Sequence, residues 1–270
     1  MQKENKFIKW ALISVSVIFL VIMLVIPIIA VIIEALKDGF TTYKNAITDN
    51  YAVSSIKLTL LATVLSVIIN TIFGLFASWT ITKFNFKGKK IVSSLMDIPL
   101  AVSPVIAGLV FILTYGRIGW AYGFLNAINL KIVFAVPGIV LATVFVTFPF
   151  ISREIIPVLN TQGNSEEEAA ALMGASGWKI FSKVTFPHIK WALLYGIVLC
   201  TARAMGEFGA VSVISGHLKG KTNTMPLHIE ILYNDFKSTD AFAVSSILVL
   251  LAIIILIVKS IIEYKGKNKE

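Results

Sequence analysis

Long apolar runs separated by short polar segments dominate this chain of 270 residues. A helix that crosses a lipid bilayer needs about 20 mostly apolar residues. Six runs reach or approach that length, at residues 10–33, 56–82, 94–114, 132–150, 189–213 and 242–262. The pattern therefore predicts an all-α polytopic membrane protein with six transmembrane helices. The first run exceeds the roughly 7–15 apolar residues of a signal peptide, so we expect it to remain as a span.

Prolines lie within three of these runs. Pro27 lies in the first run, Pro99 and Pro104 lie in the third, and Pro137 and Pro149 lie in the fourth. A proline lacks the backbone N–H of an α-helix and clashes with the preceding turn. We therefore expect a kink in the first helix and irregular ends in the third and fourth.

The distribution of positive charge predicts how the chain is oriented. Lys and Arg number 24 against 15 Asp and Glu, which gives a net charge of +9. If the N-terminus is inside, the cytoplasmic segments carry 15 of the Lys and Arg residues and the external loops carry 8. Cytoplasmic loops of membrane proteins are enriched in Lys and Arg. Both termini, and the segment 151–188, are therefore predicted to be cytoplasmic.

Three parts of the chain follow from this orientation. Residues 1–51 comprise an N-terminal cytoplasmic tail, the first transmembrane helix and an external loop. Residues 52–262 form the main transmembrane domain, and residues 263–270 form a cytoplasmic tail. No loop is long enough for a soluble domain, and no GxxxxGK[ST] phosphate loop occurs. We therefore expect no enzymatic activity in this chain.

Other chemistry is sparse. Cys200 is the single cysteine, so no intrachain disulfide can form. The three histidines have no neighbouring Cys or acidic cluster that would complete a metal site. We expect no metal, no cofactor and no nucleic-acid partner, and we attribute the net positive charge to loops that face anionic membrane lipid.

The predicted cytoplasmic segment 165–187 contains a short helix pattern. Ser165 and Glu168 fit the capping box S-x-x-E, and three acidic residues in the first turn suit the positive end of the helix dipole. Residues 169–171 are alanines, which are strong helix formers with small side chains. Gly174 and Gly177 then end this helix, and a second amphipathic stretch leads to Pro187 at the entry to the fifth span.

Two interpretations of this segment are open on physical grounds. A helix with small side chains lets another protein approach its backbone closely, as in helix-in-groove recognition. The alternative is an ordinary helical loop that lies on the membrane surface.

The segment resembles the signature loop of type-1 ABC importer permeases, E-A-A-x3-G-x9-I-x-L-P. The match consists of Glu168, Ala169, Ala170 and Gly174, followed by Val184-x-Phe186-Pro187. Val and Phe replace Ile and Leu, and the spacing is kept. The resemblance implies a type-1 importer permease core in which the loop 165–187 docks into an ATPase subunit. The five motif residues Glu168, Ala169, Ala170, Gly174 and Pro187 would then couple the permease to that ATPase.

Longer stretches resemble the sulfate/thiosulfate branch of this family. They are MDIPLAVSPVIAGLV (96–110), FVTFPFISREIIPVL (145–159), ARAMGEFGAVSVISGH (202–217) and TNTMPLHIEILYNDF (222–236). The likeness implies an ATP-driven importer of sulfate or thiosulfate in the cytoplasmic membrane. It also implies a sister permease, two copies of an ABC ATPase and an extracytoplasmic sulfate-binding protein as partners.

Three other functions are alternatives to sulfate import. Molybdate and tungstate permeases share the loop and the GEFGA stretch. An ATP-independent secondary anion transporter would leave the 165–187 motif unexplained, and a membrane enzyme would need clustered reactive side chains in the spans.

Arg203 and Glu207 are the deep charged residues of the fifth span. Their i, i+4 spacing lets them pair. The pair either holds the structure together or lies near the gate of the anion path. The flanking Gly206 and Gly209 either allow close helix packing or let the gate flex.

Two further groups are candidates. Ser103 and Pro104 interrupt the third span, where freed backbone could line a cavity or simply make a kink. His217, Lys219 and Lys221 begin a polar external segment at 215–235, which would contact the binding protein or remain a solvated loop.

Overall fold

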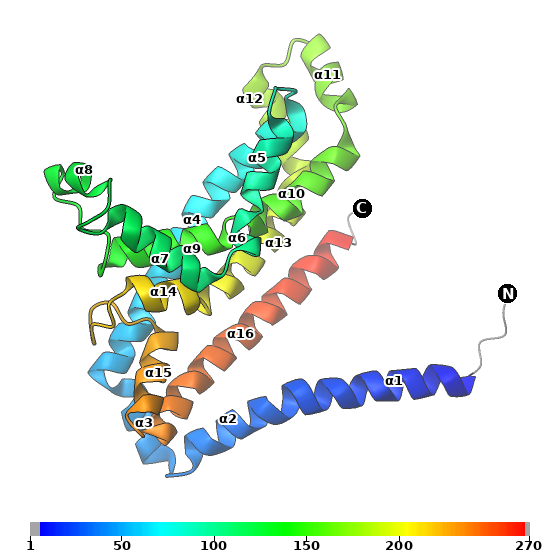
Figure 1. Cartoon of the computed structure of the whole chain (residues 1–270). Coiled ribbons are helices and arrows are strands. Elements are labelled where there is room, and N and C mark those ends of the chain that lie inside the picture. The colour runs from blue at the N-terminus through cyan, green and yellow to red at the C-terminus, as the bar shows by residue number, and fades with distance from the viewer. Residues whose placement is uncertain (1–5, 268–270) are drawn as a thin grey trace.

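A computed structural model describes residues 6–267, in which all the regular secondary structure is helical (Figure 1). Residues 1–5 and 268–270, which belong to the predicted terminal tails, lie outside the described residues. Within residues 6–267, five helices are long and apolar enough to cross a membrane: Lys6–Leu36, Asn50–Lys83, Val136–Gln162, Gly177–Met205 and Ser238–Gly266. The all-α, multi-span prediction is confirmed, while the third predicted span differs.

The segment 94–114 is not one spanning helix. It consists of α5 (Lys89–Met96), α6 (Ile98–Ala101) and α7 (Pro104–Tyr115), and only α7 is an apolar helix of 12 residues. Val102 and Ser103 have extended backbone, with ψ of 135° and 131°. A residue before proline is driven out of the helical region, so Pro104 accounts for this break.

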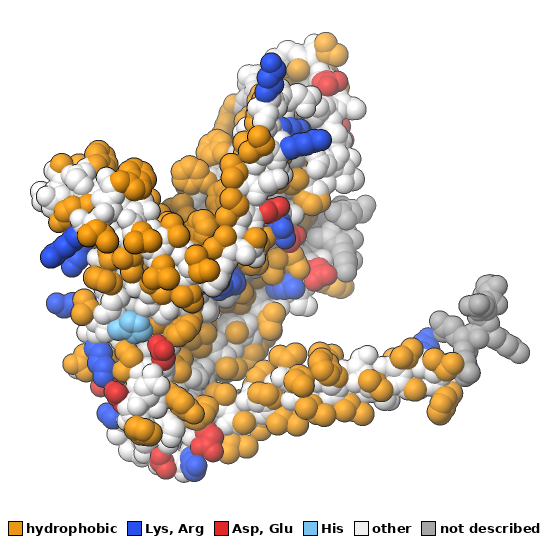
Figure 2. Space-filling view, in the orientation of Figure 1, with side chains coloured by type: hydrophobic (Ala, Val, Ile, Leu, Met, Phe, Trp, Pro, Cys, Tyr) orange, Lys and Arg blue, Asp and Glu red, His pale blue; other side chains and the backbone are white. Residues whose placement is uncertain are grey.

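The first predicted span forms an arm that leaves the body of the molecule (Figure 1). It contains α1 (Lys6–Leu20), a π turn (Val21–Val25) and α2 (Ile26–Leu36). The predicted irregularity at Pro27 takes the form of this π turn. Hydrophobic side chains cover the arm (Figure 2), and Ala35 is the one buried residue within α1, the π turn and α2. A short helix, α3 (Phe40–Thr48), leads on to the next span.

Helix α4 (Asn50–Lys83) is the longest helix in the described part of the chain. Its buried face carries small residues, and Gly74 leaves only 3.0 Å between an added Cβ and a side-chain atom of Ile151. Small side chains let membrane helices pack closely. The buried polar residues on this face are Ser55, Thr59, Thr63, Ser66, Asn70 and Ser78.

The fourth predicted span, 132–150, ends too early. After α8 (Tyr122–Ala127), the chain enters α9 (Val136–Thr147) and α10 (Pro149–Gln162), which together form one apolar helix. The length of the apolar run reflects the thickness of the bilayer, whereas the helix extends beyond that run through an amphipathic stretch. Ile151, Ile155 and Leu159 recur at helical spacing and are buried, although Pro157 lies inside the helix.

The fifth predicted span, 189–213, begins earlier and is interrupted. After α11 (Ser165–Leu172), one continuous helix contains α12 (Gly177–Ile180), a π turn (Phe181–Thr185) and α13 (Phe186–Met205). It ends at Met205, and α14 (Gly209–Ile214) follows separately. Two helices complete the fold, α15 (Met225–Asn234) and α16 (Ser238–Lys267).

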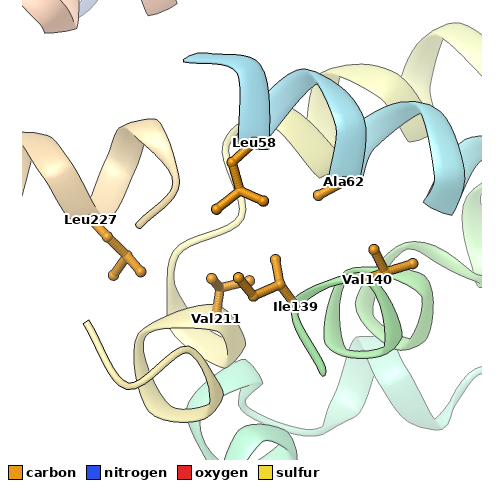
Figure 3. Close-up of a cluster of buried hydrophobic side chains, with 6 residues drawn as sticks. All are labelled: Leu58, Ala62, Ile139, Val140, Val211 and Leu227. Atoms are coloured by element: carbon orange, nitrogen blue, oxygen red, sulfur yellow. The ribbon is translucent and has the colours of Figure 1, made fainter. Parts of the chain in front are cut away.

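Buried apolar clusters join the spans. Figure 3 shows the cluster that brings together α4, α9, α14 and α15 through Leu58, Ala62, Ile139, Val140, Val211 and Leu227. A second cluster joins α10 to α13 and contains Cys200, which is fully buried as a small apolar residue. These contacts hold the interrupted helices at fixed positions against α4.

Candidate functional site

The loop 165–187 presents an open surface at one end of the molecule (Figure 1). Glu168 and Ala169 on α11 are exposed, while Ala170 is only 9% exposed. At the end of this helix, Leu172 and Met173 are 90% and 82% exposed. Large apolar side chains next to small ones form a surface suited to a protein partner.

Gly174 ends α11 for a conformational reason. Its φ is +81°, a value that side chains with a Cβ rarely adopt. The N–H of Ala175 donates to Ala170 O at 3.0 Å, and the N–H of Gly174 donates to Ala171 O at 2.9 Å. These two bonds form a Schellman motif, which satisfies the last carbonyls of the helix. Gly174 is therefore required by the turn between α11 and α12.

The predicted capping box is wrong. Asn164 is the N-cap residue and its side chain makes no capping bond, while Ser165 is the first helical residue. The three acids of the first turn instead have different surroundings. Glu166 lies 2.9 Å from His188 Nε2, and Glu167 is largely covered, whereas Glu168 is exposed.

Sequence reasoning missed the contacts of Glu167. Thr185 Oγ1 donates to Glu167 Oε1 at 2.6 Å, and Lys83 Nζ lies 3.1 Å from the same oxygen. Lys83 is the last residue of α4, and the sequence marks it only as one of the positive residues of the predicted cytoplasmic segments. The available signal was a Lys at the end of an apolar run, on the same predicted side of the membrane as the loop. The sequence does not show which acidic residue this Lys contacts.

Pro187 does not begin a new helix. It is exposed and follows the π turn 181–185 within the continuous helix 177–205. Proline lacks a backbone N–H, and the π turn before Pro187 changes the hydrogen-bond register at that point of the helix. The loop is therefore one short helix, a glycine turn and the start of a long helix, in place of two short helices.

A second candidate region lies where two helices are interrupted side by side. The extended residues before α7 include Ser103, which is exposed, and Pro104 begins α7. A Cβ added to Gly209 at the start of α14 would lie 2.9 Å from Pro104 Cβ. A Cβ added to Gly108 would lie 2.7 Å from Ala210 O. The two breaks are therefore in direct contact, and glycine is required at 108 and 209 for packing.

Arg203 and Glu207 form the expected pair, but not on one helix. Glu207 lies in the break after α13, because the helix ends at Met205. Arg203 Nη1 lies 2.7 Å from Glu207 Oε2, and the Ala210 N–H donates to Glu207 Oε1 at 2.8 Å. The exposed fraction is 33% for the Arg203 side chain and 1% for that of Glu207. The buried carboxylate thus joins the end of α13 to the start of α14, and a Cβ added to the neighbouring Gly206 would meet only Ala202 O, at 3.9 Å.

The external segment 215–235 is only partly a loop. His217, Lys219 and Lys221 are exposed as expected. Lys219 pairs with Asp235 at 3.0 Å, and His217 Nε2 lies 2.8 Å from Ser212 O. Residues 222–225 are buried, and the N–H of Met225 donates to Thr59 Oγ1 of α4 at 2.8 Å. The prediction of a solvated loop is therefore wrong for α15 and for the four residues 222–225.

These features match a known family of transport proteins. Residues 70–265 match the model of the binding-protein-dependent transport system inner membrane component. The chain belongs to this family. It is therefore a multi-pass permease component of an ABC importer in the inner membrane, and it is not itself an ATPase.

Curated relatives place the chain among sulfate system permeases. It is 45% identical over 262 residues to the sulfate transport system permease protein CysW of Escherichia coli (strain K12), covering 97% of this chain and 90% of the relative. It is 40% identical to the chloroplastic sulfate permease 2 of Chlamydomonas reinhardtii, covering 96% and 70%. It is 32% identical to the E. coli permease protein CysT, covering 89% and 87%.

A solved structure supports the fold. A bacterial ABC transporter that imports the acidic polysaccharide alginate aligns with a TM-score of 0.79 at 17% identity, covering 98% of this chain and 96% of the other. At this level of identity, the likeness concerns the fold alone.

Proposed function

We propose that this chain is the membrane-spanning permease subunit of an ATP-driven importer that moves sulfate or thiosulfate across the cytoplasmic membrane. The observation that carries the proposal is the 45% identity to a sulfate transport system permease over 97% of the chain. The exposed loop 165–187 adds a physical reason, because a permease without its own ATPase needs a surface where an ATPase can act.

Six membrane crossings fit this function. Five long helices account for five crossings. The segment of α5, α6 and α7 would supply the sixth as a broken helix, with the extended residues 102–103 at the break. An even number of crossings puts both chain ends on the same side, and the positive-inside pattern puts that side in the cytoplasm.

The partners follow from the family and from the surface. A sister permease, two copies of an ABC ATPase and an extracytoplasmic binding protein would complete the importer. Glu168, Ala169, Ala170, Gly174 and Pro187 would form or support the docking surface for one ATPase. Ala170 and Gly174 act through the shape of α11 and its Schellman turn, whereas Glu168 and Ala169 are free to touch the partner. His217, Lys219 and Lys221 would face the binding protein at the other end.

The adjacent helix breaks would serve the anion path. Ser103 and Gly206 have exposed positions beside the packed contact of Pro104 with Gly209. Arg203 supplies the positive charge in this region, and Glu207 holds the Arg203 side chain in place. Glu207 is not expected to bind sulfate itself, because a carboxylate repels an anion. The alternation between outward and inward openings would change the distance between these breaks.

The test is uptake of labelled sulfate by cells that carry the complete importer. We expect Glu168→Lys and Gly174→Asp to abolish uptake while the complex remains inserted. Glu166→Lys is the matched control, because it makes the same charge change in the same turn and breaks only an exposed pair. Normal uptake by inserted Glu168→Lys protein would refute the docking role. Thiosulfate should compete with sulfate, and better competition by molybdate would move the substrate to molybdate or tungstate.

A further inference from the structure

A cluster of polar side chains joins three elements at the loop end of the molecule. Lys83 at the end of α4 donates from Nζ to Gly163 O at 2.7 Å and to Asn164 Oδ1 at 3.1 Å. The same Nζ lies 3.1 Å from Glu167 Oε1. Lys83 Nζ therefore has three partners, which are two hydrogen-bond acceptors and one carboxylate oxygen of an ion pair. Two of them precede α11 and the third lies on it.

Glu167 extends the cluster to the start of the long helix 177–205. Its Oε1 accepts a bond of 2.6 Å from Thr185 Oγ1 while it faces Lys83. Thr185 is 1% exposed, and the side chains of Lys83 and Glu167 are 7% and 15% exposed. Water screens such a covered ion pair weakly, and removing one partner leaves an uncompensated charge. One carboxylate thus holds α4, α11 and the π turn together.

An apolar contact lies on the same two elements. The rings of Trp79 on α4 and Phe181 in the π turn have centroids 5.7 Å apart. A π turn contains one residue more than an α-helical turn, which changes the direction of the side chains beyond it. Phe181 is the first residue of this turn and Thr185 is the last. The turn therefore makes both the ring contact with Trp79 and the hydroxyl bond to Glu167.

Glycines with positive φ lie on both sides of α11, and neither is packed against other atoms. Gly163 and Gly174 have φ values of +70° and +81°, and no atom lies within 4 Å of a Cβ added to either. The other acids of the first turn do not replace the cluster. Glu166 pairs with His188, but the two side chains are 58% and 45% exposed, and Glu168 is exposed. The pair of Lys83 and Glu167 is thus the covered ionic contact between α11 and α4.

We propose that Lys83 and Glu167 transmit the movement of the coupling loop to α4. They are positioning residues, because the proposed effect passes through the contacts of Lys83 and Glu167 with α4, α11 and the π turn. This inference rests on the proposed docking of the loop 165–187 to an ATPase. A push on α11 then moves α4 through the ion pair and moves the helix 177–205 through Thr185. Without the pair, α11 keeps its turn to α12 but loses its covered ionic contact with α4, so less of the push reaches α4.

The experiment uses the complete importer in proteoliposomes, with sulfate uptake and ATP hydrolysis measured on the same sample. We expect Lys83→Met and Glu167→Gln to keep the ATPase bound and hydrolysing, while sulfate moved per ATP falls by about tenfold. Lys83→Arg should restore the ratio, because a guanidinium also donates to carbonyl and carboxylate oxygens. Glu166→Gln is the matched control and should stay within about twofold of the unmodified importer.

A milder variant covers the case in which Lys83→Met does not assemble. Thr185→Val removes only the hydroxyl bond, keeps the ion pair, and should lower the ratio by about threefold. An unchanged ratio in assembled Glu167→Gln and Thr185→Val importers would overturn the inference. If Glu168→Lys abolishes uptake while these variants behave normally, only the inference fails. If Glu168→Lys also transports normally, the docking role itself is lost.

Discussion

The loop around α11 and the paired helix breaks near α14 use glycine in opposite ways. In the loop, Gly163, Gly174 and Gly177 have no atom within 4 Å of an added Cβ. Two of them need glycine only because their φ values are positive. Here glycine sets the direction of the backbone, and the space around it stays open.

At the helix breaks, glycine makes room for packing. Gly108 and Gly209 have ordinary φ values, yet an added Cβ would lie 2.7 Å from Ala210 O in one case and 2.9 Å from Pro104 Cβ in the other. The backbones of α7 and α14 thus meet directly. The loop therefore leaves a surface for a partner, whereas the helix breaks leave no space for an extra atom.

Charge follows the same division. The buried Glu207 has a fixed set of partners at the breaks, while Glu166 and Glu168 on the loop are exposed. We therefore expect substitutions to cost stability at the breaks and to cost function, with little stability, on the loop. Three predictions test this contrast, and a fourth concerns a buried histidine on α15.

The largest effect is expected for Arg203→Ala. This change leaves the Glu207 carboxylate buried without its cation, and we expect a loss of about 3 kcal/mol in the free energy of unfolding. The value is at the low end for a buried pair because the Arg203 side chain is 33% exposed. Denaturant titration in detergent micelles measures it. The double variant Arg203→Ala/Glu207→Gln should regain more than half of the loss, and equal stability of the two variants would argue against a charge pair.

The next effect is expected for Gly108→Ala. The added methyl group meets the backbone of α14, which cannot move like a flexible side chain, so we expect a loss of about 1–3 kcal/mol. The same titration measures this loss. Gly177→Ala is the matched control, because it adds the same methyl group in open space and should change stability by less than about 0.5 kcal/mol. A control that costs as much as Gly108→Ala would remove the contrast between the two regions.

A smaller effect is expected for Gly174→Ala. Space is open there, so the cost arises only from the left-handed backbone and should be about 1 kcal/mol. We expect this cost to appear as local opening of the turn after α11, measured by hydrogen exchange of the amides of residues 174 and 175. Faster exchange confined to this turn would support the interpretation, and loss of protection throughout α7 and α14 would contradict it.

The smallest effect is a dependence of stability on pH at α15. Burial lowers the pKa of His228 below its ordinary value, while Asp49 and Asp240 act in the opposite direction and Lys219 adds to the lowering. The unfolded chain then binds a proton more readily than the folded chain. The full contribution of His228 to the free energy of unfolding should be present above about pH 6.5. This contribution should fall as the pH decreases toward the lowered pKa.

Thermal unfolding of the importer between about pH 7.5 and pH 5 measures this dependence. His228→Gln should flatten the acid side of the curve, since it removes the group that titrates. A curve that is unchanged in His228→Gln would show that other groups cause the acid effect.

The pattern of apolar residues predicted much of the fold. The spans at 56–82 and 242–262 lie within α4 and α16, because long runs without charge leave a helix few alternatives in a membrane. The motif at 168–174 also marked the exposed helix and its glycine turn. The ends were less well predicted where an amphipathic extension continued the helix, as in α10, or where proline split a run, as in the segment 94–114.

The class of protein, the family and the position of the loop could be predicted from the chain's residues, since these depend on composition and on local spacing. The packing of the helices was needed to show that Lys83 meets Glu167 and not its neighbours, that Glu207 lies in a break, and that Pro104 packs on Gly209. The reason is physical, because each of these contacts joins elements that are distant in the chain or depends on where a helix stops. Hydrophobicity and motif spacing describe neighbours along the chain, whereas the choice of a partner across space depends on how the helices pack.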